Sequence, residues 1–199
     1  MANRLDGKIG FPDAVGLYDP AQERDACGVG FVANIKGVAS HGILEDAYHV
    51  NSRMDHRGGC GFEENTGDGA GILTAIPDTF FRKIAGALAF ELPEAGRYSV
   101  GNLFLPTDEP LRISCQQTIE QVVTAEGLTF LGWRAVPIAP KTANIGPAAQ
   151  AAMPFIAQLF IASPTSDSEA DFARKLYIAR KQFSARLQPL VPDDQLVYA

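Results

Sequence analysis

The chain has 199 residues, 46% of them apolar and 20% charged, which is typical of a soluble globular domain with a sizeable core. Its net charge of −6 and its pI near 5.0 argue against nucleic acid or an anionic membrane as partners. The longest apolar stretch, 151–162, is far shorter than a bilayer span, and no secretory signal is recognisable. Three cysteines without a CxxC pair give no disulfide framework, so the composition predicts a cytoplasmic protein.

In the first half of the chain, glycines and prolines separate short apolar runs, and these runs predict the regular elements. The nearly continuous apolar character of residues 27–35 is typical of a strand covered on both faces. The expected elements, in order, are an irregular leader over 1–26, a strand over 27–35, a turn at 36–37, a helix over 41–54, a loop over 55–69, a strand over 70–76 and a short helix that follows Pro77-Asp78.

The second half alternates strands with helices, and its last helix carries the clearest periodic signal. Either Asp167 or Ser168 is expected to cap this helix. Its apolar residues recur at helical spacing, with cations on the other side: Phe172, Leu176, Ala179, Phe183 and Leu187. The other expected elements are a strand over 98–105, a helix over 108–125, and strands over 128–138 and 155–161. This pattern favours sheets that are enclosed by helices.

Cys27 stands at the head of the first predicted strand. If the chain is cut between Ala26 and Cys27, a thiol of pKa about 8.5 shares one residue with an α-amine of pKa about 7.7–8.0. This pairing supplies a nucleophile and its base without a histidine. The alternative is a structural thiol that packs as a small hydrophobic group, and position alone favours that alternative.

Three sequence motifs favour the catalytic role of Cys27 over the structural one. The chain reads ACGVGF from Ala26, MDHRGGCG from Met54 and NTGDGAGI from Asn65. Together with ANIKG from Ala33, they resemble the N-terminal amidotransferase domain of glutamate synthase large subunits, a class II glutamine amidotransferase of the N-terminal-nucleophile hydrolase group. HRG is common to class II amidotransferases, whereas TGDGAGI and ANIKG point to glutamate synthases. The resemblance is clear over 17–77 and weaker out to Leu187.

The resemblance implies an α+β fold, the four-layer α/β/β/α sandwich of the N-terminal-nucleophile hydrolases, here incomplete at the C-terminus. Residues 1–26 would be a pro-segment, and 27–199 the first part of the amidotransferase domain. Cys27 would be the catalytic nucleophile that attacks the amide of L-glutamine. Arg57 would hold the carboxylate-bearing substrate and favour the thiolate, and a surface ion pair is the alternative role for this arginine.

For a full-length parent enzyme, the resemblance implies that ammonia from glutamine feeds the reductive amination of 2-oxoglutarate. The synthase domain would hold FMN and an iron–sulfur cluster, take electrons from NADPH, NADH or ferredoxin, and associate with a small flavoprotein subunit. None of these cofactor sites is expected within the 199 residues. The oxyanion hole and the glutamine clamp would lie beyond Ala199, so the chain is expected to be a fragment that lacks glutaminase activity alone.

Other interpretations of the same residues remain open. The glycine-rich run 67–71 is a weak candidate for a phosphate cradle, because it opens a strand rather than a helix and contains Asp68. A tight turn with positive φ values is its expected role. Two alternatives for the function follow: another class II enzyme, similar to amidophosphoribosyltransferase, and a non-catalytic nucleotide-binding α/β module.

A metal site is not expected, because the candidate ligands match no zinc spacing. Cys60 is flanked by glycines and is expected to be structural, and Cys115, on an expected amphipathic helix, is expected in the core. The candidate ligands are Cys27, His41, His49, His56 and Cys60.

Overall fold

The computed structural model describes residues 28–54, 69–86, 88, 90–164 and 166–192, and the chain divides into two compact units, 1–72 and 73–199. None of the helices in these ranges combines the length and the apolar character of a membrane span. The first unit contains the helix α1 (His41–Ser52). The described elements of the second unit are α2 (Asp78–Ala85), β1 (Tyr98–Leu105), α3 (Glu109–Ala125), β2 (Thr129–Ala135), α4 (Pro140–Ala143), α5 (Pro147–Ala151), β3 (Phe155–Ala162) and α6 (Glu169–Leu187).

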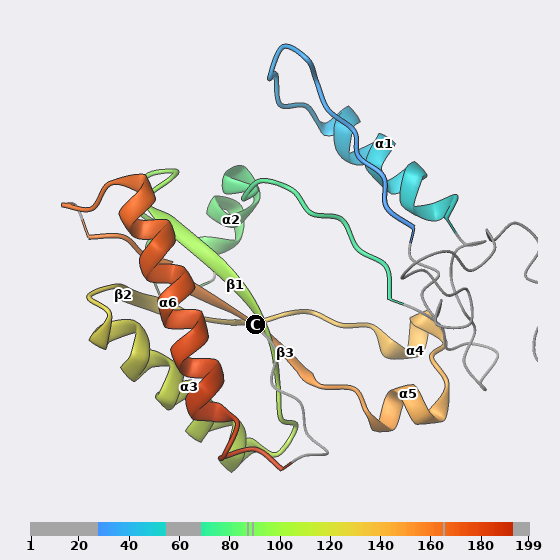
Figure 1. Ribbon diagram of the computed structural model, residues 1–199. Coiled ribbons are helices and arrows are strands. Elements are labelled where there is room, and N and C mark those ends of the chain that lie inside the picture. The colour runs from blue at the N-terminus through green and yellow to red at the C-terminus, as the bar shows by residue number, and fades with distance from the viewer. Residues whose placement is uncertain (1–27, 55–68, 87, 89, 165, 193–199) are drawn as a thin grey trace, which may run out of the picture. The chain divides into compact units, whose positions relative to one another are not determined.

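A three-stranded antiparallel sheet in the order β1-β3-β2 organises the second unit (Figure 1). The central strand β3 pairs with β1 along its whole length. Its register with β2 shifts between Phe130 and Gly132, so β2 carries a bulge there. The strands predicted over 98–105, 128–138 and 155–161 are therefore confirmed, although β2 is shorter than predicted.

The helices α3 and α6 lie side by side over one face of this sheet (Figure 1). Each begins at a side chain that accepts a hydrogen bond from a backbone N–H of the first turn. Asp108 Oδ1 accepts at 2.9 Å at the start of α3, and Ser168 Oγ accepts from the Asp171 N–H at 3.1 Å at the start of α6. Of the two predicted caps of the last helix, Ser168 is the one that acts.

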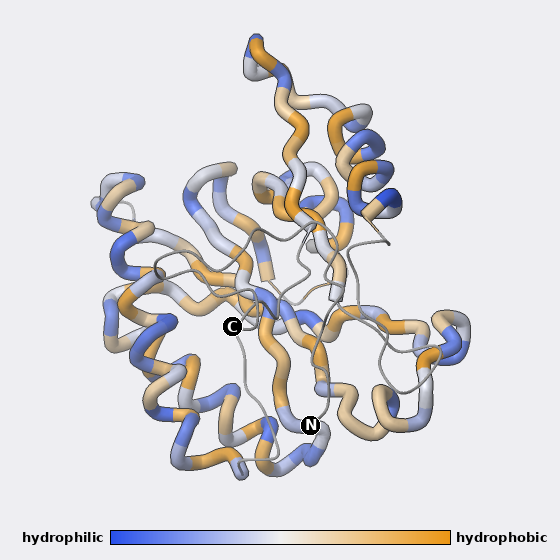
Figure 2. Tube along the Cα trace, turned by 45° about the vertical axis from the view of Figure 1, so that its right-hand side comes forward, coloured by the Kyte–Doolittle hydropathy of each residue, from blue (hydrophilic) through white to orange (hydrophobic). Residues whose placement is uncertain are grey.

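The main hydrophobic core lies between these two helices and the sheet. Along both helices, hydrophilic and hydrophobic residues alternate with the helical period (Figure 2). The apolar residues predicted to recur along the last helix belong to this core. Cys115 is fully buried in it, as predicted, and burial raises the pKa of its thiol. Other large side chains buried here are Leu103, Leu105, Ile119, Leu159 and Leu187.

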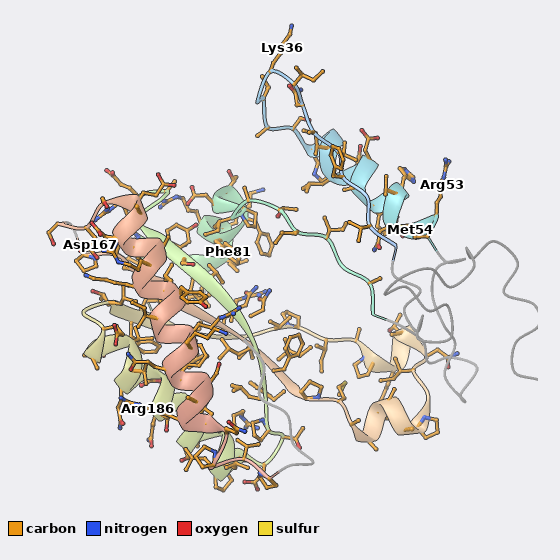
Figure 3. All side chains as sticks on the ribbon, viewed as in Figure 1. Lys36, Arg53, Met54, Phe81, Asp167 and Arg186 are labelled. Atoms are coloured by element: carbon orange, nitrogen blue, oxygen red, sulfur yellow. The ribbon has the colours of Figure 1, made fainter. Side chains whose placement is uncertain are left out.

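The opposite face of the sheet is covered at one end by α2 and the segment after it. Phe81, labelled in Figure 3, is buried there, and its ring centroid lies 5.3 Å from that of Phe160. The Phe90 ring also packs on Phe160, at 5.1 Å, and approaches the backbone of Gly132. A β-carbon at Gly132 would overlap this ring, so the close approach requires glycine.

Two predicted strands do not form in their described residues. Residues 28–35 and 70–76 are not part of a sheet, and their side chains are largely exposed: Phe31 is 91% exposed and Leu73 101%. An apolar run becomes a strand only when a neighbouring strand satisfies its backbone N–H and C=O groups, and no described segment does so here. The apolar pattern was therefore insufficient, and the prediction of paired strands is wrong for these residues.

The short helices α4 and α5 were not predicted. Each begins with a proline, which suits the first helical position, but each has five residues or fewer. Such lengths give no recognisable helical period in the sequence. Asn144 ends α4 with φ of 51°, the left-handed conformation that asparagine adopts more readily than most residues.

Candidate functional site

Both predicted site residues, Cys27 and Arg57, lie outside the residues that the structure describes. The same holds for the leader, His56 and Cys60. The structure does describe the segments that adjoin them in the sequence, residues 28–54 and 69–76.

The segment after Cys27 packs against the last turns of α1. An ideal β-carbon on Gly30 would lie 2.7 Å from Cγ1 of Val50, closer than such atoms approach in proteins. Gly30 is not among the residues with a left-handed φ, so the close approach, and not its conformation, requires glycine. Gly30 follows Cys27 by three residues and Val50 precedes Arg57 by seven, so this contact joins the two segments that lead to the predicted site.

A tight turn connects these two segments, as the sequence predicted. The Gly37 N–H donates to the Asn34 carbonyl at 2.9 Å, and the Lys36 N–H donates to Asn34 Oδ1 at 2.8 Å. Gly37 adopts φ of 68°, a conformation that favours glycine. Figure 3 shows Lys36 at the tip of this turn, and Arg53 and Met54 at the far end of α1.

The helix α1 ends two residues earlier than predicted, at Ser52. Its last turn is closed by the Arg53 N–H, which donates to the His49 carbonyl at 3.1 Å. None of its residues is buried, and even the large side chain of Tyr48 is 61% exposed. His41 Nε2 lies 3.8 Å from Glu45 Oε1, and both side chains are exposed, so this contact contributes little stability.

The described glycines of the glycine-rich run do not adopt the conformation that was predicted. Neither Gly69 nor Gly71 has a left-handed φ, and a β-carbon on either would meet no atom within 4 Å. Both lie in exposed chain without regular secondary structure. The prediction of positive φ values is wrong for these two residues, and Gly67 and Asp68 lie outside the described ranges.

Candidate metal ligands do not gather in the described part of the chain. No group of three or more His, Cys, Asp or Glu side chains is found there. His41 and His49 lie on α1 and are exposed, and Cys115 is in the core of the second unit. The other cysteines and His56 fall outside the described ranges.

Among the described residues of the second unit, a buried tyrosine has the most strongly shifted pKa. Burial, and then a hydrogen bond of 2.8 Å from its hydroxyl to Asp78 Oδ1, raise the pKa of Tyr98 to about 12. Hydrogen bonds from Arg82 and Tyr98 hold the pKa of Asp78 below its usual value. Arg82 also donates to the Pro93 carbonyl at 2.7 Å, so this network fixes the segment after α2 rather than presenting a reactive group.

A polar row crosses the same face of the sheet. Gln158 on β3 is directly opposite Asn102 on β1 and Arg134 on β2. Arg134 donates to Gln158 Oε1 at 2.7 Å, and Gln158 donates to Asn102 Oδ1 at 3.1 Å. Phe104, on the same face, is 39% exposed. Only strand pairing brings these residues together, so no local pattern in the sequence indicates the row.

Comparison with known proteins identifies the family. The family model of class-II glutamine amidotransferases matches residues 27–199. The chain is 44% identical, over 86% of its length, to the large chain of NADPH glutamate synthase from Bacillus subtilis. It is 40% identical to ferredoxin-dependent glutamate synthase 1 of Arabidopsis thaliana, over 85% of its length, and to NADH glutamate synthase of Schizosaccharomyces pombe, over 87%.

The chain spans about a tenth of the length of these curated relatives: 11% of the B. subtilis protein, 10% of the A. thaliana protein and 8% of the S. pombe protein. The family match, in contrast, covers all of the chain after residue 26. The mixed helix and strand content and the antiparallel sheet are consistent with that match. The chain therefore belongs to the class-II glutamine amidotransferases.

Proposed function

We propose that the chain forms the glutamine-hydrolysing part of a glutamate synthase, which releases ammonia from L-glutamine for the reductive amination of 2-oxoglutarate. The observation that carries this proposal is the family match over residues 27–199, together with relatives named glutamate synthases at 38–44% identity. The same relatives favour a glutamate synthase over an enzyme similar to amidophosphoribosyltransferase, and family membership removes the support for a nucleotide-binding module.

In this proposal, Cys27 is the nucleophile and residues 1–26 are a pro-segment that is removed. The Cys27 sulfur attacks the amide carbon of glutamine, and the free α-amine takes the thiol proton and passes it to the departing ammonia. Water then hydrolyses the thioester to give glutamate and the free thiol. The family match begins at Cys27, which supports both the domain boundary and the processing site.

Arg57 is proposed to bind the carboxylate of glutamine. The contact between Gly30 and Val50 is consistent with this role, because it holds the segment that follows Cys27 against the helix that precedes Arg57 in the sequence. The guanidinium group offers paired donors that match a carboxylate, and lysine does not reproduce this geometry. Arg57→Lys in the complete enzyme is expected to raise KM for glutamine with a smaller effect on kcat. An unchanged KM would contradict the assignment.

The four-layer α/β/β/α sandwich is proposed for the complete domain. One helical layer, α3 with α6, already covers one face of a sheet. The other face is only partly covered by α2, and its Phe104 is 39% exposed. A second sheet against that face would bury this side chain and the polar row beside it. A crystal structure of the complete enzyme with Phe104 in solvent would contradict this proposal.

The redox cofactors are proposed to bind outside these residues. An iron–sulfur cluster is held by cysteine thiolates, but the chain has three cysteines and Cys115 is fully buried in an apolar core. The relatives named for NADPH, ferredoxin and NADH are also about equally similar to the chain, at 44%, 40% and 40% identity. FMN, the cluster, the electron donor and a small flavoprotein subunit would therefore belong to the rest of the enzyme, and iron bound by the purified 199-residue chain would contradict this.

The central experiment compares two substrates of the complete enzyme. Cys27→Ala is expected to abolish glutamine-dependent glutamate synthesis, because no other group forms the thioester, and to leave synthesis from free ammonia detectable. Cys60→Ala is the matched control and is expected to retain both activities. Glutamine-dependent synthesis by Cys27→Ala would refute the proposal.

A further inference from the structure

The outward face of α6 has an unusual concentration of positive charge. Residues 174–186 contain five of the 17 lysines and arginines of the chain and none of its 23 acidic residues, although the whole chain has a net charge of −6. The inner face of the helix is apolar and packs in the main core. The positive charge is therefore displayed to solvent on an otherwise acidic chain.

Two large apolar side chains lie among these cations. Tyr177 is 59% exposed and Ile178 37%. The Arg180 guanidinium carbon lies 6.0 Å from the centroid of the Tyr177 ring, and Lys181 Nζ lies 5.7 Å from it. We call Arg174, Tyr177, Ile178, Arg180 and Lys181 the basic ridge.

The cations of the ridge differ in their partners. Arg174 forms an ion pair with Asp171, and the adjacent Lys175 pairs with Asp167 at 2.7 Å; Figure 3 labels Asp167 just before α6 and Arg186 near its other end. Among the residues that the structure describes, Arg180 and Lys181 form no ion pair. Tyrosine and arginine are enriched at protein interfaces, and Tyr177 with Arg180 supplies both, while Lys181 adds a charge beside them.

We propose that the basic ridge docks an acidic surface patch of a partner protein, with the Tyr177 ring at the centre and carboxylates on Arg180 and Lys181. The range of electrostatic interactions favours a protein over an extended polyanion. Charges are screened beyond about 8 Å at physiological salt, so a compact acidic patch interacts with the ridge alone. Duplex DNA or an anionic membrane extends past the ridge and meets the rest of an acidic chain. The proposal rests on the surface of α6 and is independent of the proposed function.

The test uses the full chain and three probes at the same salt concentration: a short oligoglutamate peptide, duplex DNA and phosphatidylserine vesicles. Backbone amide shifts in residues 174–186 are expected to respond to the peptide, and to DNA and vesicles only more weakly. The variant R180E/K181E is expected to bind the peptide about tenfold more weakly, as the loss of two exposed charge contacts implies. K83E/K141E makes the same change in net charge at exposed lysines outside the ridge, and should bind as the wild type does.

Both variants change exposed side chains, and their circular dichroism spectra and melts should match the wild type. Equal weakening of peptide binding in the two variants would show an effect of net charge alone and would overturn the proposal. Shift changes outside α6 would also overturn it. Tighter binding of DNA or vesicles than of the peptide would exclude an acidic protein as the occupant.

Discussion

Val50 on α1 packs directly on the backbone of Gly30, with space for a hydrogen but not for a methyl group: a β-carbon there would lie 2.7 Å from Cγ1 of Val50. The two residues are 20 positions apart, and the turn stabilised by Asn34 and Gly37 brings them together. The contact fixes the segment after Cys27 against the helix that leads towards Arg57. It is the described geometry that bears most closely on the proposed site.

Gly30→Ala is expected to destabilise this contact by about 1 kcal/mol, the low end of the range for an inserted methyl group, because Gly30 is exposed and Val50 is only partly buried. Hydrogen exchange of the α1 amides measures the effect locally. Because the clash is with one side chain, Val50→Ala should make Gly30→Ala less harmful in a double-mutant cycle. Gly69→Ala and Gly71→Ala are the controls, since a β-carbon there meets no atom within 4 Å. Protection of α1 that is unchanged by Gly30→Ala would show that the contact is absent in solution.

Tyr98→Phe is expected to lower the free energy of unfolding by about 1 kcal/mol, because it removes the hydroxyl that donates to Asp78 in a buried site. Tyr177→Phe, at a residue that is 59% exposed, is the control and should have little effect. Urea unfolding at neutral pH measures both. Equal stability of the two variants would mean that the buried hydrogen bond contributes nothing.

The same tyrosine predicts an alkaline loss of stability. Its pKa is raised to about 12 in the folded state, whereas the pKa of tyrosine in an unfolded chain is about 10. The folded state keeps a proton that the unfolded state releases, so the contribution of Tyr98 is fully present below about pH 10 and is lost as the pH rises towards about 12. Between these values, the stability of Tyr98→Phe should decline less steeply than that of the wild type. Parallel declines would contradict the raised pKa.

Ser168→Ala is expected to destabilise the second unit by about 1 kcal/mol, because the hydroxyl is the N-cap of α6 and accepts from the Asp171 N–H. Ser168→Thr should restore much of the loss, since threonine is also an N-cap residue and its hydroxyl can still donate to the Asp171 carboxylate, as the serine does at 2.7 Å. Ser184→Ala, on the exposed side of the same helix, is the control. The midpoint of thermal unfolding measures the stability of the three variants. Equal midpoints for Ser168→Ala and Ser184→Ala would show that the Ser168 cap does not stabilise α6.

Local signals explain which elements could be predicted. The last helix has a cap and an apolar residue on every turn, and β1 and β3 are apolar runs bounded by turns, so their ranges were predicted to within a residue or two. The runs 28–35 and 70–76 look similar in sequence but lack a described strand to pair with. Strand formation depends on such a partner, and composition does not reveal whether it is present.

The site was harder to predict than the fold. The motifs around Cys27 and Arg57 indicated the family, which the comparisons confirm. The roles of Gly30 and of the polar row formed by Asn102, Arg134 and Gln158 depend on contacts between residues far apart in sequence. No local pattern contains that information. The roles of Cys27 and Arg57 themselves stay predictions.

Processing offers a separate prediction. The mature complete enzyme is expected to begin at Cys27, because a blocked amine could not act as the base beside the thiol. Intact-mass analysis of the purified enzyme measures this directly. A Cys27→Ala variant is expected to retain the leader if removal of the leader depends on the thiol. Fully active enzyme that still carries residues 1–26 would contradict the proposal that the free α-amine of Cys27 acts as the base.

The most direct test of the account is to find which cysteine a reactive glutamine analogue modifies. Diazo-oxo-norleucine resembles glutamine and alkylates the thiol that would attack the amide carbon. After treatment of the complete enzyme, peptide mass mapping should find the adduct on Cys27, with loss of glutamine-dependent activity in proportion to labelling and protection by glutamine. Cys115, fully buried in its core, should remain unmodified. An adduct on Cys60 or Cys115, or complete inactivation with Cys27 unmodified, would contradict the assignment of Cys27 as the nucleophile.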